Sequence, residues 1–348
     1  MRKLIDKLYK DGDLRESELL KLITDITPED REYLFERARN KARKHYSRNV
    51  YLRGLIDIYS YCKNDCYYCG LRASNKCAER YRLDKSQILE CCKTGYELGL
   101  RTFVLQGGED MHYTDEILVD IISTIRKSYP DCAITLSLGE KSVTSYQKYF
   151  DAGANRYLLR HEAYSSDLYS KLHPKNLNIE TRLECLKNLK QIGFQTGCGF
   201  MVGAPYQTYE HIVKDLRFIK EFEPEMVGIG PFLPHSDTPF GEEQAGSVSL
   251  TLTLLAVVRL LVPTVLLPAT TALSTASEDG LVLGVRAGAN VVMPNLSPLD
   301  VRKKYMLYNG KKSSGTESAQ AIDTLKEKLE TIGYEVNFSR GDNIKFEN

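Results

Sequence analysis

The stretch Tyr51–Gly70 reads YLRGLIDIYSYCKNDCYYCG, and it joins an apolar segment directly to a cysteine-rich loop. The apolar part, Tyr51–Ser60, is typical of a buried β-strand, because short apolar runs bounded by polar residues favour strands. The loop holds Cys62, Cys66 and Cys69 in the spacing CxxxCxxC. We therefore expect a strand whose carboxyl end leads into a group of soft metal ligands.

Short apolar segments continue to alternate with amphipathic ones through most of the chain. Helical patterns such as Lys85–Glu97, Asp115–Lys127 and His211–Phe222 lie between the apolar segments. This alternation favours parallel strands with helical crossovers. Eight such units over about 250 residues match a (β/α)8 TIM barrel, and a doubly wound open sheet is the alternative. The predicted strands after the first are Arg101–Gln106, Ala133–Leu138, Arg156–Arg160, Gln195–Met201, Met226–Gly230, Val265–Ala269 and Asn290–Pro294.

The two ends of the chain depart from this α/β pattern. Residues 1–50 look helical, and Thr27–Asp30 resembles a capping box at the start of a long charged helix. We predict an N-terminal helical extension there, followed by the barrel over residues 51–310. Residues 311–348 are then a C-terminal helix, Glu317–Ile332, and a polar tail.

Charge and hydropathy exclude several classes of protein. The 47 Lys and Arg nearly balance the 46 Asp and Glu, so the net charge of +1 argues against a large surface for nucleic acid. The N-terminus lacks the apolar core of a signal peptide. The most apolar stretch, Leu250–Leu267, contains Arg259 and Pro263, and fits a buried helix followed by a buried strand. We expect a cytoplasmic protein with no membrane partner.

Nine cysteines in such a chain suggest metal or redox chemistry, because the cytoplasm keeps thiols reduced. Cys91, Cys92, Cys132 and Cys185 fall in predicted helices or a strand. For these four we expect the role of small buried hydrophobic residues, which free cysteine commonly has.

The three cysteines at 62, 66 and 69 suit one face of a 4Fe–4S cube. Three thiolates leave one iron without a protein ligand, and a chelating small molecule can bind it. The amine and carboxylate of S-adenosylmethionine (SAM) suit that role, and an electron from the cluster then cleaves SAM to a 5′-deoxyadenosyl radical. Tyr68 is placed to lie against the adenine ring.

Two other interpretations of the cysteines remain open. Cys77 follows Cys69 by eight residues, and it would complete a four-cysteine zinc site. It would equally complete an electron-transfer cluster with four cysteine ligands. The position of the loop after the first barrel strand favours catalysis, because barrel enzymes build their active sites on such loops.

Polar residues follow several other predicted strands, and in a barrel they converge on the same mouth. The two glycines of QGGED, residues 106–110, let the backbone approach a ligand, and the acids can accept hydrogen bonds from an ammonium group. Burying the three ionisable groups of Arg160–Glu162 without partners would be costly, so we expect them at a ligand-lined rim. His235 alone is more typical of a structural histidine. The candidates from strand ends are Gln106, Gly108, Glu109, Ser137, Arg160, Glu162, Thr270 and Thr271.

A series of blocks gives the chain a family resemblance: CKNDCYYC (62–69), LQGGED (105–110), LSLGE (136–140), YLLRHE (157–162), MVGAPYQT (201–208), GIGPFLPHSDTP (228–239), PATTAL (268–273) and GANVVMPN (288–295). In this order they resemble the HydE family, the radical SAM maturases of FeFe-hydrogenase assembly. Methylornithine synthase of pyrrolysine biosynthesis shares the barrel and the cluster loop and is the nearest alternative. YLLRHE and GIGPFLPH favour the maturases. Biotin synthase, a sulfur-inserting enzyme, is a more distant relative.

The resemblance implies a complete barrel with SAM near its top and one 4Fe–4S cluster on the cysteine triplet. Glu162 and Arg182 would hold the methionyl part of SAM, with Arg182 pairing with its carboxylate. Arg182 is singled out by the resemblance alone, since a charge in a predicted helix is normally solvated. The residues that would line the cavity are Arg160, Thr270, Thr271, Tyr305 and Tyr308.

The resemblance also implies a substrate and partners. The substrate would be an iron–cysteine complex carrying CO and cyanide, made by a tyrosine-cleaving radical SAM maturase, and a GTPase scaffold would receive the product. An external electron donor is needed. Some members of the family carry a second cluster on C-terminal cysteines, but no cysteine follows Cys198 here. NGKKSSGTES (309–318), whose composition is typical of a surface loop, stands in that region. We therefore expect one cluster.

Overall fold

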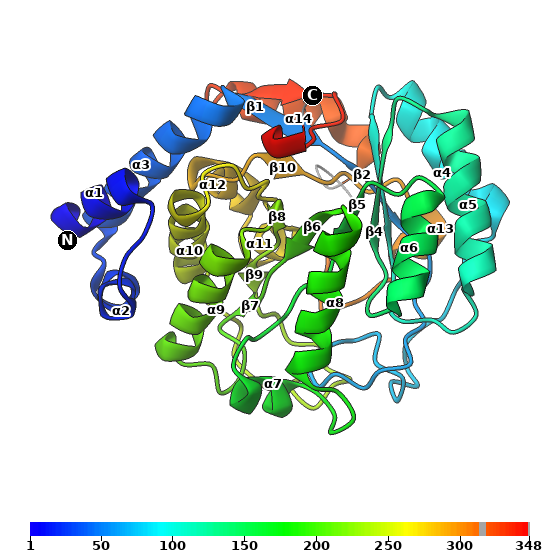
Figure 1. Cartoon of the computed structure of the whole chain (residues 1–348), viewed down its shortest axis with the longest axis horizontal. Helices are drawn as coiled ribbons and strands as arrows, with labels where there is room; N and C mark the ends of the chain where they lie inside the picture. The colour runs from blue at the N-terminus through cyan, green and yellow to red at the C-terminus, as the bar shows by residue number, and fades with distance from the viewer. Residues whose placement is uncertain (313–317, 347–348) are drawn as a thin grey trace.

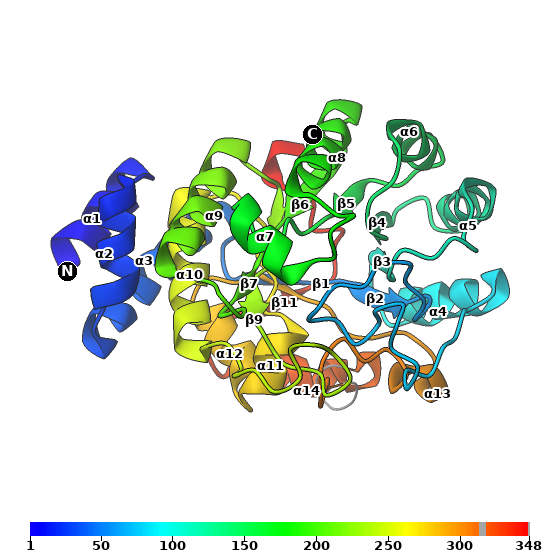
Figure 2. The ribbon, with the colours of Figure 1, turned by 90° about the horizontal axis from the view of Figure 1, so that it is seen from below.

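The computed structural model describes residues 1–312 and 318–346. Helices surround the strands, and α1–α3 lie together on one side (Figures 1 and 2). The strands are β1 (Asn49–Leu52), β2 (Gly54–Asp57), β3 (Thr102–Gln106), β4 (Ala133–Ser137), β5 (Arg156–Leu158), β6 (Gln195–Cys198), β7 (Met201–Val202), β8 (Met226–Val227), β9 (Gly230–Pro231), β10 (Val291–Val292) and β11 (Glu335–Asn337).

The helices fall between the strands, as the alternating pattern predicts. They are α1 (Arg2–Asp11), α2 (Glu16–Asp25), α3 (Pro28–Tyr46), α4 (Lys85–Glu97), α5 (Asp115–Ser128), α6 (Val143–Asp151), α7 (Ser166–Leu172), α8 (Ile179–Ile192), α9 (Tyr209–Phe222), α10 (Val248–Leu261), α11 (Thr271–Ala276), α12 (Gly280–Arg286), α13 (Leu299–Arg302) and α14 (Ile322–Glu330).

The strands form a closed ring, which confirms the predicted barrel. The parallel strands β2, β3, β4, β5, β6 and β8 are neighbours in that order. In a doubly wound sheet, the order of the strands would reverse partway across the sheet. The segment Val265–Ala269 bridges the gap after β8: Leu266 pairs with Met226, and Pro268 pairs with Val291 of β10. β10 pairs with β1, and β1 continues through Arg53 into β2. The ring is therefore complete.

Four predicted strands are interrupted: Tyr51–Ser60 divides into β1 and β2, and Met226–Gly230 divides into β8 and β9. Local backbone chemistry explains the interruption of the other two. The seventh consists of isolated bridges, because Pro268 has no N–H to donate to a ladder. The strand Gln195–Met201 divides into β6 and β7 around Gly199, whose φ is 152°. A Cβ at Gly199 would lie 2.0 Å from the carbonyl oxygen of Gly228, so only glycine allows the two backbones to approach so closely.

The N-terminal extension packs against the barrel through α3 and α10. Thr27 caps α3 as predicted, since its hydroxyl accepts a hydrogen bond from the backbone N–H of Asp30. α10 is the buried helix expected from the apolar stretch. Arg259 in it is fully buried and donates to the carbonyl groups of Gly288, Pro263 and Val265, so its charge is compensated.

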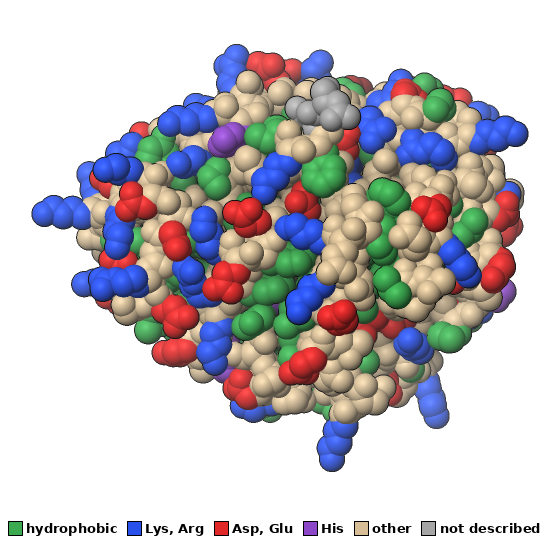
Figure 3. All heavy atoms as spheres, viewed as in Figure 1, with side chains coloured by type: hydrophobic (Ala, Val, Ile, Leu, Met, Phe, Trp, Pro, Cys, Tyr) green, Lys and Arg blue, Asp and Glu red, His purple; other side chains and the backbone are tan. Residues whose placement is uncertain are grey.

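Basic and acidic side chains are interspersed over most of the face in Figure 3. Within the described residues, no helix combines the length and apolarity that a bilayer crossing requires. Cys91, Cys92, Cys132 and Cys185 are buried, as predicted.

The polar C-terminal tail closes the bottom of the barrel. β11 pairs in parallel with β1, and the following residues cross the amino-terminal ends of β5 and β6. There Asp342 contacts the fully buried Arg156 at 2.5 Å and accepts a hydrogen bond from Gln195 at 2.6 Å. The tail thus supplies the counter-charge that a buried arginine requires.

This ion pair predicts an acid-sensitive stability. Burial opposes ionisation of Asp342, but Arg156 and Arg340 outweigh it and lower its pKa from 3.8 to about 2. A lowered pKa in the folded state stabilises the protein above the unfolded-state pKa, and this contribution is lost as the pH falls from about 5 to 2. We expect the ion pair to contribute about 1–2 kcal/mol to the free energy of unfolding at pH 7. One pKa unit corresponds to about 1.4 kcal/mol, and solvent screens a partly accessible carboxylate.

Urea unfolding at pH values between 2 and 7 measures this contribution. Asp342→Asn should be less stable than the parent protein at pH 7 and should converge with it in acid. Equal stability of the two proteins at pH 7 would show that the ion pair contributes nothing.

Candidate active site

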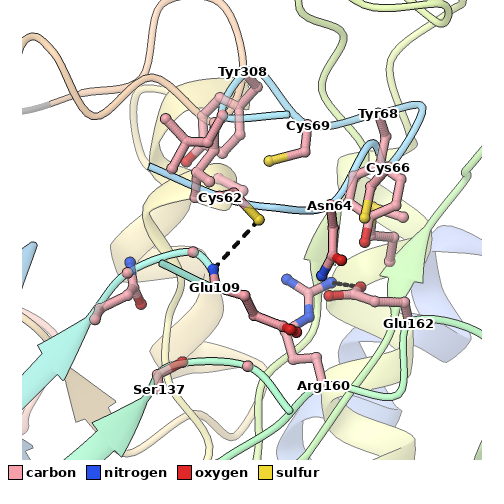
Figure 4. A pocket seen from close by; sticks show the side chains of 18 of the residues that line it. Cys62, Asn64, Cys66, Tyr68, Cys69, Glu109, Ser137, Arg160, Glu162 and Tyr308 are labelled. Atoms are coloured by element: carbon pink, nitrogen blue, oxygen red, sulfur yellow. Dashed lines mark hydrogen bonds and ion pairs between the residues drawn. The ribbon is translucent and has the colours of Figure 1, made fainter. Parts of the chain in front are cut away.

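A cavity of about 280 Å³ lies at the carboxyl ends of the strands (Figure 4). Every site residue predicted from the sequence lines it, apart from Thr270 and Thr271. These two lie at the start of α11, next to Ala272, which does line the cavity. The predicted residues in the lining are Cys62, Cys66, Tyr68, Cys69, Gln106, Gly108, Glu109, Ser137, Arg160, Glu162, Arg182, Tyr305 and Tyr308.

The cysteine loop is held by hydrogen bonds from a side chain to its backbone carbonyl groups rather than by regular structure. Arg80, which the sequence did not single out, donates to the carbonyl groups of Ser60, Leu71, Arg72 and Asn75. These bonds fold the long excursion after β2 back onto itself. They fix the backbone that carries the three cysteine sulfur atoms, and a fixed backbone favours ligation.

The three sulfur atoms fit a cluster that is bound in a sheltered place. Figure 4 shows them beside the cavity, above Arg160 and Glu162. Burial raises the pKa of the Cys66 thiol and raises the pKa of the Cys69 thiol to about 12, so metal charge is needed to hold them as thiolates. Gly108 leaves room for the loop, since a Cβ there would lie 2.6 Å from that of Cys62.

Cys77 lies apart from this group. It is exposed and is not among the residues that line the cavity. Across residues 1–312 and 318–346, no three His, Cys, Asp or Glu side chains converge as ligands of a single ion would. The ligands of a cluster differ in this respect, because each cysteine binds a different iron.

Arg160, Glu162 and Arg182 place opposite charges on one wall of the cavity, and each arginine pairs with a carboxylate. Arg160 Nη2 lies 3.0 Å from Glu162 Oε2, and Arg182 Nε lies 2.7 Å from Glu140 Oε1. Apart from these two ion pairs, the four buried atoms have no hydrogen-bond partner among the described residues. An amino-acid group, with one carboxylate and one ammonium, matches such a wall.

Burial affects the two partners of the second pair in opposite ways. It raises the pKa of Glu140, and Arg182 opposes that effect. Burial lowers the pKa of Arg182, but the nearby Tyr169, Glu140 and Glu109 outweigh that effect. They hold the pKa of Arg182 well above its usual value. Arg182 is therefore a permanent cation beside the cysteine loop, although it lies on a helix.

Tyr68 is fixed beside the third cysteine by a histidine. Its hydroxyl lies 3.1 Å from His173 Nε2, and the two rings meet edge to face at 5.4 Å. His173 Nδ1 lies 2.9 Å from the carbonyl oxygen of Tyr169, which orients the imidazole. The position of Tyr68 in the lining is compatible with the predicted adenine contact, which stays a prediction.

The far side of the cavity is closed by the segment after α13. Tyr305 and Tyr308 of this segment both line the cavity. Leu307 accepts a hydrogen bond from the backbone N–H of Gly70, so this segment rests on the cysteine loop. His235 packs on the same glycine, where a Cβ would lie 2.4 Å from its ring. This contact agrees with a structural histidine.

Lys311 shows that the predicted loose loop begins with a buried anchor. Its Nζ lies 3.2 Å from Asp57 Oδ2 and 4.6 Å from the ring centre of Tyr305. Asp57 also accepts hydrogen bonds from Gln106, which lines the cavity, and from Asn295, which follows β10. Residues 313–317 of the predicted loop lie outside the described residues.

His161 departs from the expectation for its neighbours. Arg160 and Glu162 line the cavity, but His161 is fully buried behind it and contacts Asp215 of α9. Successive residues of an extended segment point to opposite sides, so the three could not all face a ligand.

Comparison with known proteins gives the same family from independent evidence. The radical SAM superfamily model matches residues 56–219. HydE of Thermotoga maritima, an FeFe-hydrogenase maturase subunit, is 42% identical over 87% of this chain and 86% of its own length. The 3-methylornithine synthase of Methanosarcina acetivorans is 31% identical over 85% of this chain and 84% of its own length. The crystal structure of methylornithine synthase (PylB) matches with a TM-score of 0.85 at 28% identity, and the match covers 96% of this chain and 97% of that structure's chain.

Proposed function

Because the chain belongs to the HydE family of radical SAM enzymes, we propose that it acts in assembly of the FeFe-hydrogenase cofactor, on an iron–cysteine complex that carries CO and cyanide. The supporting observation is the convergence of three cysteine sulfurs, Glu162 and Arg182 on one cavity. The identity of 42% to a maturase, against 31% to a methylornithine synthase, favours hydrogenase maturation.

The cysteine triplet and the charged wall divide the binding of the cofactors between them. Cys62, Cys66 and Cys69 would hold one 4Fe–4S cluster, Arg182 would pair with the SAM carboxylate, and Tyr68 would contact adenine. When bound, the cluster and SAM supply a 5′-deoxyadenosyl radical. Glu162 would accept from the methionyl group of SAM, and Arg160 keeps its carboxylate turned into the cavity through the 3.0 Å contact.

The remaining lining residues would receive the substrate. Arg160 offers a cation to cyanide, and Tyr305 and Tyr308 close the cavity against bulk water. Thr270 and Thr271 would reach a substrate larger than the present cavity from the start of α11. A tyrosine-cleaving radical SAM maturase would supply the substrate, and a GTPase scaffold would receive the product. The second cluster is dispensable in this scheme, since the chain has no cysteine after Cys198.

Genetic complementation tests this function. Expressed anaerobically in a hydrogenase-producing strain that lacks its own HydE-type maturase, the chain should restore hydrogenase activity, and its Cys66→Ala variant should not. Lysine and SAM incubated with the reconstituted protein serve as the opposing assay. Absence of rescue together with methylornithine formed from lysine would contradict the proposal and assign an amino-acid mutase.

A further inference from the structure

Glu162 has an unusual backbone conformation for a non-glycine residue. Its φ is 64°, in the left-handed region, and its carboxylate lies in the cavity beside Arg160 (Figure 4). Its N–H donates to the carbonyl oxygen of Gly199 at 3.0 Å, and Glu162 forms a parallel bridge with Phe200. Such a conformation persists only where the surroundings fix it.

A buried His–Asp pair contacts the chain on both sides of Glu162. Asp215 Oδ1 lies 3.1 Å from His161 Nε2 and accepts from the backbone N–H of Tyr164 at 2.7 Å. The N–H of Gly199 donates to His161 Nδ1 at 3.3 Å. Because Nδ1 accepts, the ring proton is on Nε2 and is donated to Asp215. One carboxylate oxygen thus holds the residue before Glu162 and the second residue after it.

Stability alone gives a poor account of this pair. Both side chains are fully buried, and burial raises the pKa of Asp215. Its Oδ2 has no hydrogen-bond partner among the described residues. A buried carboxylate with an unused oxygen is costly, and an apolar residue of similar size would pack between α9 and the barrel at lower cost. The hydrogen bonds that the pair makes with the backbone all lie at the turn that carries Glu162.

We propose that His161 and Asp215 are positioning residues, a buried clamp that sets the backbone of Glu162 so that its carboxylate meets SAM. The inference rests on the proposed function, in which Glu162 binds the methionyl group. Neither side chain is among the residues that line the cavity, so the clamp acts through the backbone at residues 161, 164 and 199.

Asp215→Leu removes both acceptor contacts and keeps the side-chain size. SAM binding to the anaerobically reconstituted protein, measured by equilibrium dialysis, should weaken roughly 10- to 100-fold, the range typical when a partner that orients a ligand-binding group is lost. Asp215→Asn retains an acceptor oxygen and should bind SAM nearly as well as the parent. Hydrogen exchange in the metal-free protein should become faster at the amides of Glu162 and Tyr164 in Asp215→Leu.

A matched control separates positioning from general stability. Asp342→Leu breaks a buried ion pair at the opposite end of the barrel, so it should lower the melting temperature and leave SAM affinity unchanged. If Asp215→Leu yields too little folded protein, His161→Phe carries the test, since it keeps the ring packing on Phe200 and Phe218 without either nitrogen.

The outcomes distinguish the two proposals. Failure of the parent protein to bind SAM would overturn the proposed function. Parent-like SAM affinity in Asp215→Leu or His161→Phe, with a parent that binds SAM, would overturn the clamp alone. If Asp342→Leu and Asp215→Leu both weaken SAM binding by the same factor, the clamp would also be overturned, because the effect would then come from lower stability.

Discussion

Replacing Cys66 by alanine is expected to abolish SAM cleavage while the barrel remains folded. The remaining two thiolates cannot retain a cube whose open iron depends on three. Cys66 lies in a loop that other contacts hold, including the four carbonyl groups bound by Arg80, so its removal leaves the loop in place. Iron content and 5′-deoxyadenosine formed under reducing conditions report the effect, and circular dichroism reports the fold.

Cys77→Ala is the control for this prediction. It removes an exposed thiol from the same loop, and we expect iron content and SAM cleavage equal to those of the parent. Loss of metal from Cys77→Ala would instead assign the site to four cysteines, and with it either zinc or an electron-transfer cluster.

Arg182→Met should weaken SAM binding by roughly 10- to 100-fold. Hydrogen bonds to charged groups contribute about 1.5–3 kcal/mol, and about 1.4 kcal/mol corresponds to a factor of ten. The substitution keeps the apolar stem that covers the cavity wall and removes the guanidinium. Equilibrium dialysis with SAM measures the change, and Lys187→Met, an exposed position on the same helix, should leave it unaffected.

The loss of Arg182 also leaves Glu140 buried without its partner at 2.7 Å. The double variant Arg182→Met, Glu140→Gln removes that unpaired charge, so it should recover stability but not SAM affinity. Recovery of SAM binding in the double variant would show that Arg182 serves Glu140 and does not hold the ligand.

The site residues that could be predicted from the sequence are those in short local motifs or at the ends of predicted strands. The spacing of Cys62, Cys66 and Cys69 lies within one loop, and the barrel places strand-end residues such as Gln106 and Glu162 at one mouth. Arg182 required the family resemblance, because nothing local distinguishes it from a solvated helix charge. Whether Thr270 and Thr271 touch a ligand stays a prediction.

The missed residues are defined by contacts between distant parts of the chain. Lys311 and Asp57 are 254 positions apart, and His161 and Asp215 are 54 apart. Nothing close to these side chains in the sequence indicates their partners, and His161 was therefore expected at the ligand-lined rim. The tail was missed for a similar reason, since the polarity of Arg340 and Asp342 suggests solvent until the buried Arg156 is placed beneath them.

The EPR spectrum of the reduced, reconstituted protein, recorded before and after addition of SAM, tests the central claim most directly. Three cysteines leave one iron open, so we predict about four irons per chain and a spectrum whose g-values shift when SAM binds. A signal that SAM leaves unchanged, from a protein that loses its metal on Cys77→Ala, would contradict an open-iron site and the radical chemistry built on it.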